Sequence, residues 1–204
     1  MDVAVNSGLL CKFAPELIHT MSKDYLRTNE EFKQVLAECR SLFENKLRDY
    51  SASWRILRTP SVTDQLFIKA KRIRSLEIKK ESLVGDGIRG EYIALINYGI
   101  VGLIQIELGC ADETDITADE AMVYYDRYAT EALELMKKKN HDYDEAWRSM
   151  RITSYTDFIL TKIQRVKEIE DNDGTTLVSE GIGSNYMDII NYSVFGVIKL
   201  NEQG

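Results

Sequence analysis

The sequence is poor in the residues that cross-link or interrupt small proteins. It has 3 cysteines and 2 prolines among 204 residues, and Cys11, Cys39 and Cys110 are widely spaced with no CxxC pair. An odd, scattered set of cysteines excludes a disulfide framework and a cysteine-based zinc site. The first residues also lack the basic and apolar segments of a secretory signal, so we expect a reducing, cytoplasmic location.

Long hydrophobic runs and excess positive charge are missing too. The most apolar segment, 92–106, is shorter than the roughly 20 residues that a membrane-spanning helix needs, so we expect a buried helix and no membrane contact. The net charge is −7, from 26 basic and 33 acidic residues. This balance argues against nucleic acid as a partner of the whole protein. Only the stretch 54–80 is strongly basic.

What the chain does contain is an internal repeat. The pattern Y-x-x-x-W-R at residues 50–55 recurs at residues 143–148. Further identical pairs follow in the same order: Ser61/Ser154, Thr63/Thr156, Lys69/Lys162, Arg72/Arg165, Glu77/Glu170, Tyr92/Tyr186 and Asn97-Tyr98/Asn191-Tyr192. We therefore predict a tandem duplication, with an N-terminal extension at 1–23, a degenerate first repeat at 24–109 and a second repeat at 110–204.

Each repeat predicts three helices. Capping-box patterns at 28–31 and 117–120 are expected to begin the first helix, similar patterns at 61–64 and 154–157 the second, and apolar stretches at 89–107 and 184–202 form the third. No segment shows the alternation of a β-strand. The predicted fold is all-α, with two three-helix repeats packed as a pseudo-symmetric bundle.

Repeated cations form the first candidate binding group: Arg55, Arg58, Lys69 and Arg72, matched by Arg148, Arg151, Lys162 and Arg165. Residues three apart share a helix face, so Lys162 and Arg165 suit a phosphate-bearing ligand. The alternative is a solvated or ion-paired face.

Acids and amides form the second group. Asp188 and Asn191 lie three residues apart, with Glu180 just before their helix, and these oxygens suit a hydrated Mg²⁺. In the first repeat Ala94 replaces Asp188. As the alternative, Asn97 and Asn191 satisfy buried backbone groups. The aromatic pairs Trp54/Trp147 and Tyr98/Tyr192 are most simply core residues, and His141 is a helix-end residue or a catalyst.

The string Lys139-Asn140-His141-Asp142-Tyr143, together with Trp147, Lys162-x-x-Arg165, Glu180-Gly181 and Asp188-x-x-Asn191-Tyr192, resembles a nucleotide-modification-associated helical domain family of phages and bacteria. The resemblance covers the second repeat almost wholly and the first more weakly. It implies a link to nucleotide or DNA-base modification. The chain also resembles, more distantly, the all-α nucleoside triphosphate pyrophosphohydrolases of the MazG type, although it lacks their paired acidic motifs.

Three functional hypotheses follow. In the first, the chain binds a nucleotide, with Mg²⁺-assisted pyrophosphohydrolase activity on nucleoside triphosphates as its further possibility. Arg151, Lys162 and Arg165 contact phosphates together with Lys69, Arg72, Asn191 and Tyr192, Glu180 and Asp188 hold Mg²⁺, and His141 and Asp188 act in catalysis. In the second it is a non-enzymatic helical interaction or assembly module, whose basic stretch 69–80 meets an acidic partner. A homo-oligomer is compatible with either hypothesis. In the third, Arg55, Arg58 and Trp54 stack on single-stranded nucleic acid, which the net charge disfavours.

Overall fold

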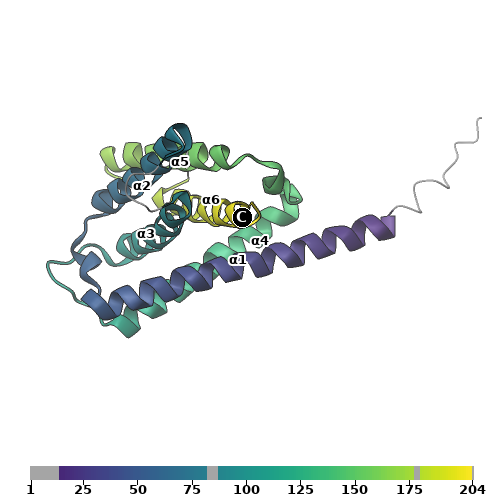
Figure 1. Ribbon diagram of the computed structural model, residues 1–204. Helices are drawn as coiled ribbons and strands as arrows, with labels where there is room; N and C mark the ends of the chain where they lie inside the picture. Colours follow the sequence, from purple (N-terminus) through teal and green to yellow (C-terminus); the bar gives the residue numbers. More distant parts are fainter. Residues whose placement is uncertain (1–13, 82–86, 177–179, 204) are drawn as a thin grey trace, which may run out of the picture.

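Within the described residues, six α-helices form three stacked layers of two (Figure 1). The computed structural model describes residues 14–81, 87–176 and 180–203, with side chains from residue 25 onward. One outer layer holds α1 (Ala14–Tyr50) and α4 (Ala118–Tyr143), the central layer α3 (Ile88–Leu108) and α6 (Ile182–Asn201), and the other outer layer α2 (Thr59–Lys79) and α5 (Ile152–Asp171). Short 3₁₀ helices, η1 (Ser53–Ile56) and η2 (Ala146–Ser149), follow α1 and α4. The described part of the chain contains no strand, which confirms the all-α prediction.

Each layer pairs one helix from each repeat. The segment α1–η1–α2–α3 corresponds in order to α4–η2–α5–α6, so the two repeats are related by a pseudo-twofold axis through the central layer. One continuous hydrophobic cluster includes residues of both repeats, and the repeats therefore share a single core. Helix α3 is long and apolar enough to cross a membrane, but 72% of its most apolar window is buried among the other helices. The expectation of a buried helix at 92–106 is confirmed.

Glycines allow the two central helices to approach closely. A Cβ atom on Gly102 of α3 would lie 2.0 Å from the Tyr186 ring, and one on Gly196 of α6 would lie 2.8 Å from the Tyr92 ring. These are equivalent contacts, because Gly102 and Tyr92 correspond to Gly196 and Tyr186. Each tyrosine therefore occupies space left by a glycine of the other repeat.

The same tyrosines take part in two reciprocal hydrogen-bonded clusters. The hydroxyl oxygen of Tyr186 lies 2.8 Å from Thr63 Oγ1, which donates to Glu170 Oε1 at 2.8 Å. In the other cluster, Tyr92 lies 2.9 Å from Thr156 Oγ1, which donates to Glu77 at 2.7 Å. Burial raises the pKa of both glutamates. These contacts explain why a threonine, a tyrosine and a glutamate recur in both repeats.

The predicted start of the first helix is correct in the second repeat and wrong in the first. The capping box of Thr117 and Glu120 is present, with both reciprocal hydrogen bonds. The predicted start at Thr28 is wrong, because α1 begins at Ala14 and runs through this residue. Thr28 is buried and donates to Glu145, so its side chain makes a tertiary contact and no cap. This places residues 14–23 of the expected extension in α1.

The second helices also begin earlier than predicted. Their N-cap residues are Arg58 and Arg151, three residues before the expected Ser61 and Ser154 caps, and neither makes a side-chain capping bond. Pro60 stands in the first turn of α2, where the lack of an N–H is tolerated and the fixed φ favours the helix. The third helices start and end within two residues of the prediction.

Candidate functional site

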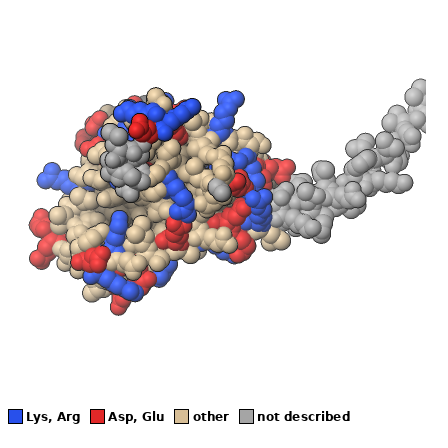
Figure 2. Space-filling model, viewed as in Figure 1, with Lys and Arg blue, Asp and Glu red and all other residues tan. Residues whose placement is uncertain are grey.

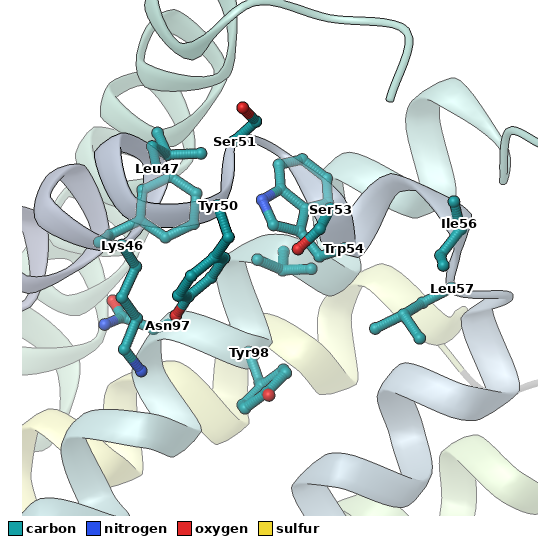
Figure 3. A pocket seen from close by; sticks show the side chains of 12 residues that line it. Lys46, Leu47, Tyr50, Ser51, Ser53, Trp54, Ile56, Leu57, Asn97 and Tyr98 are labelled. Atoms are coloured by element: carbon teal, nitrogen blue, oxygen red, sulfur yellow. The ribbon is translucent and has the colours of Figure 1, made fainter. Parts of the chain in front are cut away.

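An open cleft lies in the first repeat, between the end of α1, η1 and the middle of α3. Its volume is about 310 Å³. Aromatic rings form much of its wall (Figure 3): Tyr50 and Trp54 come from the α1–η1 side and Tyr98 from α3. Tyr50 is 52% exposed, so much of its side chain is open to solvent. We call this the aromatic cleft; its other lining residues are Phe43, Lys46, Leu47, Ser51, Ser53, Ile56, Leu57, Asn97 and Val101.

The polar groups of the aromatic cleft differ in their availability. Asn97 is committed to the fold, because Tyr125 donates to its Oδ1 at 2.8 Å and its amide donates to the Cys39 carbonyl at 3.3 Å. Lys46 stands at the edge of the cleft, is exposed, and has no ion-pair partner among the described residues. The indole N–H of Trp54 is buried and has no hydrogen-bond acceptor among the described residues. The cleft thus combines aromatic surface with one uncommitted cation.

Burial and the neighbouring Tyr98 raise the pKa of Tyr50. Its hydroxyl therefore stays protonated at neutral pH and acts as a hydrogen-bond donor. Sequence reasoning missed Lys46 and Tyr50, although a signal was present: both recur in the second repeat, as Lys139 and Tyr143.

The equivalent region of the second repeat brings together two of the predicted phosphate and metal residues. Asp188 is only 6% exposed and bridges two lysines. Lys162 Nζ lies 2.6 Å from its Oδ2, and Lys139 donates to its Oδ1. Both carboxylate oxygens are thereby paired, as a buried charge requires. We call these three residues the Lys–Asp–Lys cluster.

Other predicted residues lie beside the Lys–Asp–Lys cluster. Exposed Glu180 lines a groove of about 390 Å³ together with Lys139 and Asp188. Tyr192 is half-buried, and its pKa is raised by burial and by the Asp188 carboxylate. The positive charges of Lys139 and Arg165 offset part of this rise. Arg165 itself is exposed and faces a different groove, on α5.

The remaining predicted residues of the second repeat stand apart. The His141 side chain is 85% exposed, and Nδ1 lies 3.1 Å from Asp142, its chain neighbour. Arg151 is exposed at the N-cap of α5. Asn191 is buried, and neither end of its amide has a hydrogen-bond partner among the described residues.

Asn97 and Asn191 are equivalent, yet only Asn97 is satisfied. The hydroxyl that bonds Asn97 belongs to Tyr125 of α4, on the other repeat. The residue of α1 that corresponds to Tyr125 is Phe32, which has no hydroxyl. The loss of this hydroxyl in the duplicated position explains why Asn191 Oδ1 has no donor among the described residues.

Lys69 and Arg72, two of the predicted cations of the first repeat, are ion-paired within the fold, whereas Arg58 is exposed at the N-cap of α2. Lys69 Nζ lies 3.4 Å from Oε2 of the buried Glu91, and Arg72 pairs with Oε1 of the same carboxylate. Glu91 lies one turn before Ala94, the residue equivalent to Asp188. The acid has moved by one turn along the helix and still meets the lysine that both repeats contain.

The basic stretch 54–80 contributes less free positive charge than its composition indicates. Arg55 is only 2% exposed and makes a bidentate contact with Asp115, at 2.7 and 3.0 Å. It also donates to the Gly109 carbonyl, which fixes the connection between α3 and α4. Arg55 therefore cannot serve the stacking platform for nucleic acid that its position beside Trp54 suggested. On the visible face in Figure 2, basic and acidic residues are interspersed.

The donor groups do not fit a resident Mg²⁺. Asp188 has ammonium groups on both oxygens, whereas Mg²⁺ requires carboxylates free to face it. No group of three or more His, Cys, Asp or Glu side chains within the described residues could hold a metal ion.

Comparison with known proteins gives one match. A family model described as nucleotide modification associated domain 1 matches residues 46–106 and again residues 139–200, together more than half of the chain. Both matches begin at the repeated lysine, Lys46 or Lys139, and include the aromatic residues that follow it. No curated protein and no solved structure matches the chain, and the likeness to MazG-type enzymes has no support.

Proposed function

Since the chain belongs to the nucleotide modification associated domain 1 family, we propose that it binds a nucleotide in the aromatic cleft of its first repeat. The cleft itself is the main support: four aromatic side chains, Phe43, Tyr50, Trp54 and Tyr98, and one uncommitted lysine surround a space of about 310 Å³. A space of this size lies at the lower end of the range for small-molecule sites. It suits a single nucleotide, with no room for an extended strand.

The aromatic wall supports recognition of the base. Tyr50, Trp54 and Tyr98 present ring faces and edges within one space (Figure 3). Base–aromatic stacking contributes roughly 1–3 kcal/mol per base and tolerates all four bases. The Tyr50 hydroxyl adds a donor for base or sugar acceptors.

Lys46 supports recognition of the phosphate. Its equivalent in the second repeat, Lys139, already contacts an anion, the Asp188 carboxylate. A lysine in this position therefore reaches a negatively charged oxygen when one is available. In the first repeat, where Ala94 replaces Asp188, the phosphate of the ligand supplies that anion.

Hydrolysis is not part of the proposal. Pyrophosphohydrolase chemistry of the two-metal type needs several carboxylates around the ions, and the Lys–Asp–Lys cluster offers one carboxylate that is already neutralised. The His141 side chain is 85% exposed and lies against Asp142, the next residue of the chain, so we assign it no proton-transfer role. The chain acts as a nucleotide-binding component in nucleotide modification.

Calorimetric titration with the four ribonucleoside 5′-monophosphates, with and without Mg²⁺, tests the proposal. We expect saturable binding that Tyr50→Ala weakens about tenfold or more, from the loss of roughly 1.4 kcal/mol of stacking. Tyr143→Ala is the matched control, because Tyr143 is the equivalent residue of the second repeat and is 70% exposed. The absence of binding by every monophosphate at millimolar concentration refutes the proposal, and so does an equal effect of the two variants.

A further inference from the structure

We infer that the second repeat contains the same kind of site in a closed form, filled by its own Phe195 and Asp188, so that each chain binds one ligand. Val101 is the residue that keeps the first site open. The identity of the ligand rests on the proposed function, whereas the open and closed states rest on the packing alone.

The two sites share the aromatic and polar residues on which the proposed binding depends. Lys46, Tyr50, Trp54, Asn97 and Tyr98 of the aromatic cleft are matched by identical residues in the second repeat, namely Lys139, Tyr143, Trp147, Asn191 and Tyr192. The pseudo-twofold axis places both sets at equivalent points of the fold. Other lining positions differ between the repeats, and two changes give the second repeat groups of its own that occupy the site.

The first changed position decides whether the apolar space is open. Val101 lines the aromatic cleft, and Phe195 replaces it in the second repeat. The Phe195 ring stacks on Trp147, with ring centroids 4.2 Å apart and planes 11° from parallel. Trp147 is buried as a result, whereas Trp54 is half-buried and lines the cleft. Phe195 makes the stacking contact with its tryptophan that a base would make with Trp54.

The second changed position decides whether the lysine is free. Asp188 pairs with Lys139, while Ala94 leaves Lys46 without a carboxylate at the equivalent point. The second repeat thus supplies from its own chain an aromatic ring and an anion. These are the two chemical groups that a nucleotide brings to the first repeat.

Acrylamide quenching of the two tryptophans tests the open and closed states without any ligand. In the wild-type chain we expect Trp54 to be quenched and Trp147 to be protected. Val101→Phe should protect Trp54 as well, and Phe195→Val should make both tryptophans accessible. Far-UV circular dichroism and urea unfolding verify that each variant is folded. Unchanged quenching in a folded Val101→Phe variant overturns the inference, whether or not a nucleotide binds.

Calorimetry with the tightest-binding monophosphate then measures stoichiometry. We expect one site in the wild-type chain, at least a tenfold loss of affinity in Val101→Phe, and two sites in the double variant Phe195→Val/Asp188→Ala. If the double variant does not fold, the single variant Val101→Phe still decides the matter. Wild-type affinity in Val101→Phe, or two sites in the wild-type chain, contradicts the inference. If no monophosphate binds the wild-type chain, the proposed function fails and the quenching result alone decides this inference.

Discussion

Replacing Gly102 by alanine should destabilise the fold, although alanine is the better helix former. A Cβ at this position would lie 2.0 Å from Cε1 and 2.6 Å from Cδ1 of Tyr186. The ring cannot simply swing away, because its hydroxyl is held at 2.8 Å from Thr63 Oγ1. Overpacking of this kind costs about 1–3 kcal/mol, against a gain of up to about 1 kcal/mol from helix propensity.

Two other glycines provide the scale for this measurement. At Gly196 the Cβ would meet the Tyr92 ring at 2.8 Å, and at Gly90 it would meet nothing within 4 Å. In urea unfolding we therefore expect Gly102→Ala to lose the most stability, Gly196→Ala to lose less, and Gly90→Ala to gain a few tenths of a kcal/mol. Equal unfolding midpoints for Gly102→Ala and Gly90→Ala would refute the close packing of α3 on α6.

Two further predictions concern buried polar groups. Tyr125→Phe removes the donor to Asn97 Oδ1 and should lower the free energy of unfolding by about 1–3 kcal/mol, measured by urea unfolding; no change would show that Asn97 finds another partner. Burial raises the pKa of Glu77 and Glu170 above 4.5, so the folded state binds these protons more tightly than the unfolded state. The stability gained by protonating these two glutamates is fully present below pH 4.5, and it is lost as the pH rises through their pKa values in the folded state. The variant Glu77→Gln/Glu170→Gln should therefore gain less stability than the wild-type chain when the pH falls from 7 to 5, and an unchanged pH slope contradicts this reasoning.

The repeat and the third helices were predictable because their signals are local. Identical residues at corresponding positions reveal duplication directly, and the continuous apolar stretches mark α3 and α6 to within two residues at each end. The cap at Thr28 failed for the opposite reason. A threonine followed three residues later by a glutamate fits a helix start, but the Thr28 hydroxyl bonds Glu145 from the other repeat. A contact this distant in sequence overrides the local pattern.

The candidate site was harder to predict because its lysine, tyrosines, tryptophan and asparagine are present in both repeats. The sequence directs attention to Asp188, a charged residue present in one copy, and the structure shows that its charge is neutralised by two lysines. The open cleft depends instead on Val101 and Phe195, two apolar residues that a sequence pattern assigns equally to the core. Whether an apolar side chain fills a space or leaves it open depends on volume and packing, which hydrophobic periodicity does not report.

The reciprocal contacts between the repeats lead to a prediction about the first repeat alone. Its central helix is covered by α6, and its Tyr92 fits against Gly196 and bonds Thr156, all from the other repeat. An isolated segment 24–109 would therefore expose a large part of its apolar surface as a monomer.

The same segment contains its own copies of the missing partners. Thr63, Glu77 and Gly102 correspond to Thr156, Glu170 and Gly196, so two copies of the segment can replace the pseudo-twofold axis by a true one. We expect segment 24–109 to fold as a homodimer, with coupled dissociation and unfolding in sedimentation and circular dichroism at a series of concentrations. Thr63→Val should weaken this dimer, because it removes the hydroxyl from both reciprocal clusters at once. A stable folded monomer would show that the contacts between repeats are dispensable, and an unfolded chain at millimolar concentration would show that the first repeat does not retain the complementarity of the duplicated fold.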